Sequence, residues 1–146
     1  MKSTDIISRL PYTDPFLFVD EITAVSKDKI EGNYLFKRTH DFYSGHFKNL
    51  PVTPGVILAE CMAQIGVVSL GIYLLDIEQT VVEPLQIAMT SSHVDFLLPV
   101  YPGEKVFVRS VKQYFRFNKL KCHVTMTNAE EKVLCRGEIS GMILKP

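Results

Sequence analysis

Hydrophobic residues divide this chain into one long apolar run and several shorter stretches in which apolar and polar residues alternate. The long run covers residues 54–75, PGVILAECMAQIGVVSLGIYLL, and its length predicts a helix that ends near residue 76. Thr53 is a residue type that caps helix N-termini, and Pro54 suits the first helical position, where no amide donor is needed. The pattern therefore predicts one long helix that is apolar on every face.

The alternating and β-branched stretches predict about six strands. The expected elements are a short helix over 4–10, strands over 16–25, 29–38, 85–96 and 104–117, and two strands within 119–144 that join at 128–131. Tyr101-Pro102-Gly103 predicts a turn before the fourth strand. One twisted antiparallel sheet curled around the helix would bury the helix on most sides. We therefore expect an α+β fold and a single domain over residues 1–146.

Composition narrows the class of protein. Apolar residues make up 47% of the chain and charged residues 22%, which is typical of a globular domain. Sixteen basic and sixteen acidic residues cancel, so no net field attracts nucleic acid or an anionic membrane. The first residues, MKSTDIISRLPYTD, contain no apolar signal-peptide core. We expect a cytoplasmic protein that does not bind nucleic acid.

The apolar run is also long enough to span a bilayer. It carries Glu60 and Gln64 near its middle and has no basic flank, and a charged side chain is costly at a bilayer centre. A helix of this kind is equally suited to the enclosed core of a soluble fold, so we expect no membrane insertion. Cys61, Cys122 and Cys135 lack metal-ligand spacing and are expected to be buried, reduced thiols.

The segment with candidate chemistry is 41–64, DFYSGHFKNLPVTPGVILAECMAQ. His46 lies in its irregular part, and Glu60 lies fourteen residues later inside the apolar helix. Burial of an unpaired carboxylate is costly and raises its pKa. A carboxyl group held neutral can donate a proton, and a neutral imidazole can accept one. Elimination of water requires both of these roles.

Gly55 and Gln64 extend this pair. Gly55 lies in the first helical turn, where amide N–H groups have no intrahelical acceptor and the helix dipole favours negative charge. A thioester carbonyl can approach this N–H closely because Gly55 has no side chain. Gln64 stands four residues after Glu60 on the same helical face and is expected to orient its carboxyl group. Each residue alone also has an ordinary structural explanation, and the combination carries the hypothesis.

These residues together resemble the signature of the bacterial beta-hydroxyacyl-acyl-carrier-protein dehydratases of the hotdog fold. The similarity begins at Leu10-Pro11 and DPFLFVDEI, and it continues through FYSGHF and PVTPGVILAECMAQ. It returns more weakly in FLLPVYPGE, at residues 96–104. A glutamate at position 60, instead of an aspartate, resembles the branch of this family that dehydrates without the accompanying double-bond isomerase activity. The resemblance covers most of the chain in order.

The resemblance implies a role for each residue. His46 aligns with the catalytic histidine, Glu60 with the catalytic acid and Gly55 with the amide that polarises the thioester carbonyl. The implied reaction converts a (3R)-hydroxyacyl chain on acyl carrier protein into the trans-2-enoyl product, in fatty-acid or polyene and aryl-lipid biosynthesis, with no metal or redox cofactor. The histidine and the acid of one site come from different subunits in this family, which implies at least a homodimer; a hexamer, as a trimer of dimers, stays open. Aromatic residues expected along an acyl tunnel are Phe16, Phe18, Phe42, Tyr43 and Phe47.

The chain departs from the family pattern at the expected entrance for the carrier. Tyr12 and Thr13 replace a basic pair, and residues 95–98 are less basic than usual. Acyl carrier proteins are acidic, so docking normally uses a positive rim. The remaining basic candidates are Lys48, Arg109, Arg116, Lys119, Lys121 and Arg136, for each of which an ordinary solvated charge is an equally good explanation.

Three alternatives stay open at this point. A hotdog thioesterase would use the carboxylate to activate water, which leaves His46 without a purpose. An enoyl-CoA hydratase would pair Asp41 with His46 in one loop, although the surrounding sequence does not otherwise match. A non-catalytic acyl-binding subunit would have no need to retain His46 and Glu60 together.

Overall fold

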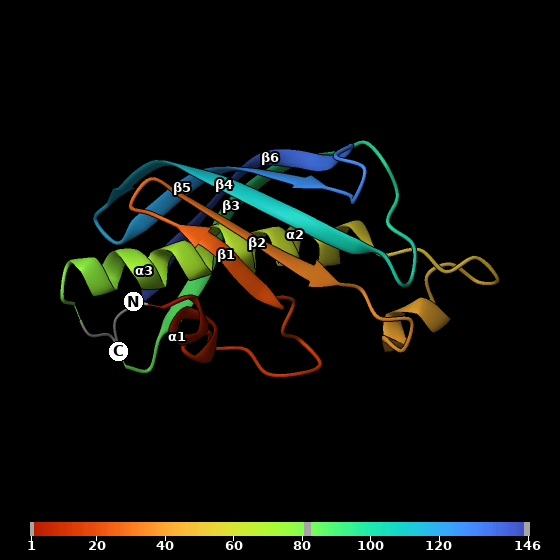
Figure 1. Ribbon diagram of the computed structural model, residues 1–146, viewed down its shortest axis with the longest axis horizontal. Coiled ribbons are helices and arrows are strands. Elements are labelled where there is room, and N and C mark those ends of the chain that lie inside the picture. The colour runs from red at the N-terminus through yellow and green to blue at the C-terminus, as the bar shows by residue number, and fades with distance from the viewer. Residues whose placement is uncertain (1, 81–82, 145–146) are drawn as a thin grey trace.

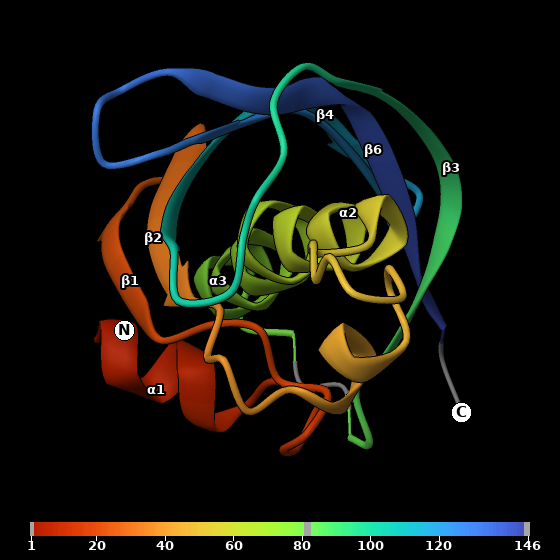
Figure 2. The same ribbon diagram turned by 90° about the vertical axis from the view of Figure 1, so that its right-hand side faces the viewer.

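A six-stranded antiparallel sheet curls around one long central helix (Figures 1 and 2). The computed structural model describes residues 2–80 and 83–144. The strands are β1 (Glu21–Val25), β2 (Lys29–Leu35), β3 (Gln86–Phe96), β4 (Lys105–Arg116), β5 (Lys119–Thr127) and β6 (Val133–Leu144). Their spatial order is β1-β2-β4-β5-β6-β3, and every neighbouring pair is antiparallel. The predicted α+β hotdog architecture is confirmed.

The central helix consists of α2 (Gly55–Ala63), a π-helical segment η2 (Gln64–Val68) and α3 (Ser69–Ile77). It is long and apolar enough to cross a membrane, but 72% of its most apolar window is buried inside the protein. The sheet curves around it, and α1 (Ser3–Ser8) lies at the open side of the curve (Figure 2). Burial in the core therefore accounts for the apolar composition of the helix on all faces.

The start of the helix differs from the prediction. Pro54 occupies the N-cap position with extended backbone angles, and Gly55 is the first helical residue. Thr53 does not cap the helix, because its hydroxyl forms a 2.6 Å hydrogen bond with the Tyr43 hydroxyl. Both side chains are buried, so this tertiary contact replaces the local capping interaction.

The first strand is also shorter than predicted. It begins at Glu21 instead of residue 16. Phe18 lies in the core, and its amide donates to the side chain of Gln64 on the helix over 2.7 Å. Because this amide is bonded to the helix, the backbone at Phe18 does not pair with the sheet, and pairing with β2 starts where the Asp20 amide donates to the Asn33 carbonyl over 2.9 Å.

The inner face of the sheet carries the core, and buried positions alternate with half-buried or exposed ones along β4 and β5. The helix approaches β4 closely at Gly66, where an added Cβ would lie 2.9 Å from the Ser110 Cβ. The Ser110 hydroxyl donates to the Gly66 carbonyl over 2.8 Å and satisfies a carbonyl within the π-helical segment. The three cysteines are buried and free, as predicted, and burial raises the pKa of each thiol.

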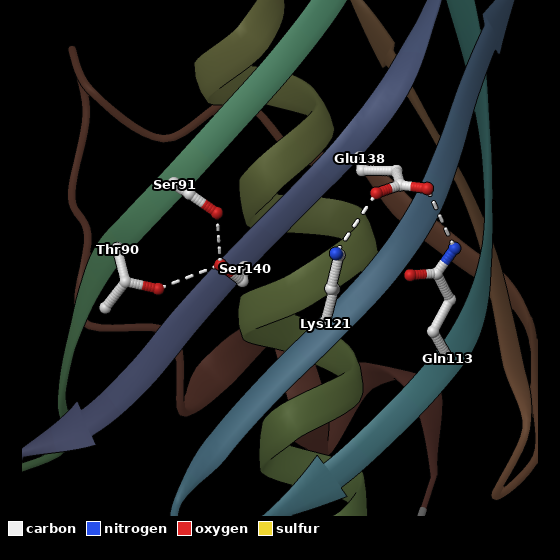
Figure 3. A network of polar contacts seen from close by, with 6 residues as sticks. All are labelled: Thr90, Ser91, Gln113, Lys121, Glu138 and Ser140. Carbon is white, nitrogen blue, oxygen red and sulfur yellow. Dashed lines mark hydrogen bonds and ion pairs between the residues drawn. The ribbon is translucent and has the colours of Figure 1, made fainter.

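Strand β3 forms one edge of the sheet. It is eleven residues long, and within the described chain it pairs only with β6. A bulge at Thr90 interrupts the pairing, and the hydroxyls of Thr90 and Ser91 both bond Ser140 on β6 (Figure 3). Met89 and Phe96 on this strand are 45% and 50% exposed. The fold thus leaves a long edge strand with apolar side chains uncovered.

Candidate active site

A cavity of about 210 Å³ lies between the central helix, β3, β6 and the segment before β1, and Glu60 is in its wall. Apolar side chains of the helix and strands make up most of the remaining lining. The lining residues are Tyr12, Phe16, Glu60, Ala63, Val67, Val68, Ile87, Met89, Ile139, Ser140 and Gly141. Glu60 is the only carboxyl group among them. The cavity is therefore an apolar compartment with one acidic side chain.

The Glu60 side chain is half-buried, and its environment favours the protonated form. Burial raises the pKa of its carboxyl group, and the hydrogen bond from Gln64 partly opposes this effect. Gln64 Nε2 donates to Glu60 Oε2 over 2.9 Å. The N–H donor orients the carboxyl group, and the larger effect of burial keeps its pKa above the ordinary value, so the protonated form is favoured.

Gln64 is fully buried and uses its amide group in three hydrogen bonds. Its Oε1 accepts from the Phe18 amide over 2.7 Å, and its Nε2 donates to the Phe16 carbonyl over 3.0 Å in addition to Glu60. These contacts fix which end of the amide faces the carboxyl group. The predicted contact between Gln64 and Glu60 is present in the structure, and two backbone partners that the sequence did not indicate fix its direction.

Tyr12, one of the positions at which the sequence departs from the family pattern, also lines this cavity. Its side chain is partly buried beside Phe16, with ring centroids 6.4 Å apart. Burial, together with the negative charge of Glu60, raises the pKa of its hydroxyl to about 12. The phenol is therefore neutral at physiological pH and supplies a polar group within the Glu60 cavity. The proximity depends on the fold, because Tyr12 and Glu60 lie far apart in the sequence.

His46 lies in the loop before the helix, and its ring is held in one orientation. Its Nδ1 lies 2.9 Å from the Val52 carbonyl oxygen, and the Val52 amide donates to the His46 carbonyl over 2.8 Å. A carbonyl oxygen only accepts hydrogen bonds, so Nδ1 carries the proton in this contact and Nε2 keeps a free lone pair when the ring is neutral. The Phe47 ring stacks on the imidazole at 4.1 Å. This tautomer is the one that accepts a proton at Nε2.

Gly55 stands at the start of α2, where the first amide groups of the helix have no intrahelical acceptor. A Cβ at this position would lie 3.3 Å from the Phe96 ring. The absence of a side chain therefore leaves the backbone accessible beside an aromatic ring. The role predicted for Gly55, an amide that polarises a carbonyl group, requires such an accessible N–H and stays a prediction.

The structure brings only some of the predicted site residues together in one chain. Glu60, Gln64 and Phe16 form one group, while His46 does not line the Glu60 cavity of the described chain. Of the aromatic residues predicted along a tunnel, only Phe16 lines this cavity. Phe18 is buried in the core, Phe42 and Tyr43 lie in the 3-10 helix η1 (Asp41–Ser44), and Phe47 is 58% exposed.

A larger concavity of about 560 Å³ lies on the outer face of the sheet. Arg109, Thr125 and Glu131 are among its lining residues, and it contains none of the predicted catalytic residues. The smaller cavity is the candidate site, because it is lined mostly by apolar side chains and contains the carboxyl group with a raised pKa. Within residues 2–80 and 83–144, no cluster of His, Cys, Asp and Glu has the geometry of a metal site.

Comparison with known proteins supplies a family. A family model described as the FabA-like domain matches residues 10–140. The chain is 38% identical over 103 residues to the 3-hydroxyacyl-[acyl-carrier-protein] dehydratase FabZ of Nitratidesulfovibrio vulgaris. The aligned region covers 69% of this chain and 64% of that protein. It is 32% identical over 142 residues to the protein of the same name from Petrotoga mobilis, and this match covers 95% of each chain.

Solved structures share the fold at low sequence identity. A chain of the dehydratase heterocomplex ApeI:P from Xenorhabdus doucetiae superposes with a TM-score of 0.81 at 13% identity, over 99% of this chain and 93% of that chain. The thioesterase HI1161 from Haemophilus influenzae superposes with a TM-score of 0.59 at 19% identity, over 86% of this chain and 78% of that chain. These two comparisons establish the architecture alone.

Proposed function

This chain belongs to the FabA-like domain family, and on that premise we propose that it is a hydro-lyase that dehydrates a (3R)-hydroxyacyl chain held as a thioester on acyl carrier protein. The observation that carries the proposal is the contrast between its two candidate groups. The Glu60 carboxyl has a raised pKa and is oriented by Gln64, while His46 is held with Nε2 free to accept a proton. An acid and a base in these states match the two proton transfers of dehydration.

The proposed reaction proceeds through charge that develops on the thioester. His46 Nε2 removes the proton from C2, and the electron pair of that bond moves toward the thioester carbonyl, where the Gly55 amide stabilises the negative charge. The electron pair returns to form the trans double bond between C2 and C3 as the bond from C3 to oxygen breaks. Glu60 gives its proton to the departing hydroxyl, which leaves as water.

Gln64 has an orienting role in this scheme. Its amide is anchored to the backbone at Phe16 and Phe18, so its Nε2 donor occupies a fixed position against Glu60. A fixed donor on one carboxyl oxygen leaves the other oxygen to hold the acidic proton and face the substrate. Apart from Glu60, Tyr12 and Ser140, the cavity is lined by apolar residues and Gly141, which suits an acyl chain.

We propose that one complete site needs two copies of the chain. Two observations support a homodimer: His46 is not part of the Glu60 cavity of its own described chain, and β3 leaves a long edge with exposed Met89 and Phe96. Pairing of two β3 edges would satisfy the free backbone groups and cover the apolar side chains. A hexamer, as a trimer of dimers, is a further assembly to be distinguished by mass.

The acyl carrier protein is the proposed donor of the substrate. Among the basic candidates for its docking, Lys121 already forms a 3.2 Å ion pair with Glu138 (Figure 3). Arg116 is exposed and lies over the Tyr114 ring at 4.4 Å. Arg116 is therefore a better candidate than Lys121, since its charge is not neutralised by that contact. The buried free cysteines fit the proposed cytoplasmic location.

The activity is tested with purified protein and 3-hydroxyacyl-carrier substrate, followed by mass spectrometry of the acyl group. Loss of one water supports dehydration, whereas release of free acid supports a thioesterase and would overturn the proposal. An unchanged acyl chain would indicate a non-catalytic binding subunit. His46→Ala and Glu60→Gln should each lower turnover by about 10²–10⁴-fold. The exposed controls His123→Ala and Glu78→Gln should keep full activity.

The shared site is tested by mixing. Neither His46→Ala nor Glu60→Gln homodimers should turn over substrate, but subunit exchange between them assembles heterodimers with one intact site. Restored activity after mixing supports a site built from two chains. Inactive mixtures with demonstrated subunit exchange would place both groups in the same chain.

A further inference from the structure

A second histidine, His40, lies six residues before His46 and has no part in the proposed chemistry. Its half-buried side chain immediately precedes η1 and sits within a group of aromatic rings, with centroid distances between 4.9 and 6.4 Å. The surrounding rings are Phe18, Tyr34, Phe36, Phe42 and Tyr43. Packing alone would explain an aromatic side chain at this position, so the polar contacts of the ring decide its role.

The His40 ring makes a short hydrogen bond to the sheet. His40 Nε2 lies 2.7 Å from the hydroxyl of Tyr34, which is on β2 and 2% exposed. Burial raises the pKa of the Tyr34 hydroxyl, so this group keeps its proton and donates. Burial and the charge of Lys37 lower the pKa of His40, while Asp14 and Asp41 act in the opposite direction. A neutral imidazole that accepts at Nε2 fits these surroundings.

The same residue is joined to the segment that leads to His46. Its ring stacks on Phe42 at a centroid distance of 4.9 Å and an angle of 14°. Its carbonyl accepts from the Tyr43 amide over 3.2 Å, and the Phe42 carbonyl accepts from the Gly45 amide over 3.3 Å. Gly45 directly precedes His46. The contact between His40 and Tyr34 therefore links η1 to β2.

The C-terminal end of the loop that carries His46 is also attached to the rest of the protein by hydrogen bonds. The Tyr43 hydroxyl bonds the Thr53 hydroxyl over 2.6 Å, and the Thr53 amide donates to the Val100 carbonyl over 2.8 Å. Val52, next to Thr53, holds His46 through two hydrogen bonds. The loop is thus closed on itself around His46 and connected to the rest of the protein at its two ends.

We propose that His40 is a positioning residue that holds the loop carrying His46 in the geometry needed for proton transfer. This inference rests on the proposed function of His46 and adds a residue to it. Loss of the anchor at Tyr34 frees η1 to shift, and a displacement of about 1 Å in a reacting group lowers the rate by about 10²-fold. Binding of the acyl chain uses the Glu60 cavity, which contains neither His40 nor Tyr34.

The test uses three variants of the full chain. His40→Phe keeps the stacking and removes the acceptor, Tyr34→Phe removes only the donor oxygen, and His40→Gln supplies a replacement acceptor. We expect kcat of the first two to fall by about 10–100-fold while KM changes by less than about two-fold. His40→Gln should recover most of the loss, and the double variant should be no worse than either single variant. His123→Phe, at an exposed position on β5, is the matched control.

The deciding readout is the protonation state of the His46 nitrogens, observed by ¹⁵N NMR of histidine-labelled protein. In the unaltered chain Nδ1 should carry the proton, and in His40→Phe and Tyr34→Phe the two tautomers should mix. Unchanged His46 signals in both variants would overturn the proposal, whether or not kcat falls. If the unaltered protein removes no water, the proposed function fails, but the NMR comparison still decides whether His40 positions His46.

Discussion

Replacement of Gln64 by methionine tests the central polar contact of the proposed site. Methionine keeps the length and unbranched shape of glutamine but cannot bond the Phe18 amide, the Phe16 carbonyl or the Glu60 carboxyl group. The buried Phe18 amide and the partly buried Phe16 carbonyl then lose their partners, and an unsatisfied buried group costs about 1–3 kcal/mol. We expect the free energy of unfolding to fall by about 2 kcal/mol or more. For a chain of this size that corresponds to a fall in Tm of about 4–8 °C.

The same replacement should move the pH dependence of activity. The Gln64 N–H stabilises the Glu60 carboxylate, so its removal raises the pKa of Glu60 further above the ordinary range. A general acid must be protonated, so the alkaline limb of the kcat profile should shift to higher pH even as kcat itself falls. The direction of the shift separates a local effect on Glu60 from a general loss of structure.

The stability is measured by urea unfolding at one fixed protein concentration, because the apparent stability of a dimer depends on concentration. Met62→Leu is the control, since Met62 is fully buried on the same helix and a volume-conserving replacement costs less than about 1.5 kcal/mol. A loss below about 1 kcal/mol for Gln64→Met, or an alkaline limb that stays in place, would refute the assigned role of Gln64.

Three further predictions concern the cavity and the edge strand. The unaltered protein should lose activity as the pH rises through the raised pKa of Glu60, as measured by the pH profile of the rate. The stability contributed by the protonated carboxyl should fall over the same pH range, as measured by unfolding. A pH-independent rate on the alkaline side would contradict this prediction. Gly137→Ala should destabilise the pairing of β3 with β6, because the new Cβ would overlap the His93 carbonyl oxygen. Hydrogen exchange along β3 should increase in this variant and stay unchanged in the control Gly45→Ala. Gly141→Ala places a methyl group 3.2 Å from Ile87 in the cavity wall. This change should reduce kcat/KM more for long than for short acyl chains. An equal loss of kcat/KM for all chain lengths would exclude the cavity as the acyl site.

The sequence alone determined the main elements of the fold. The apolar run at 54–75 predicted the central helix because nearly every position in it is apolar, and the helix observed ends one residue beyond the predicted end. The alternating stretches predicted β4, β5 and β6 within a few residues, since half-buried strands repeat every second residue. The contact between Glu60 and Gln64 also followed from spacing, because residues four apart share a helical face.

Tertiary structure decided the features that depend on residues distant in the chain. Residues 16–20 have strand-forming composition, yet the Phe18 amide bonds Gln64, 46 residues away, and β1 begins later. Thr53 has capping chemistry, but its hydroxyl is bonded to Tyr43 across the loop. The fold also placed Tyr12 beside Glu60, and it separated the Glu60 cavity from His46 within one chain. Local sequence patterns do not predict such partners, because buried polar groups find their hydrogen-bond partners only when distant segments of the chain pack together.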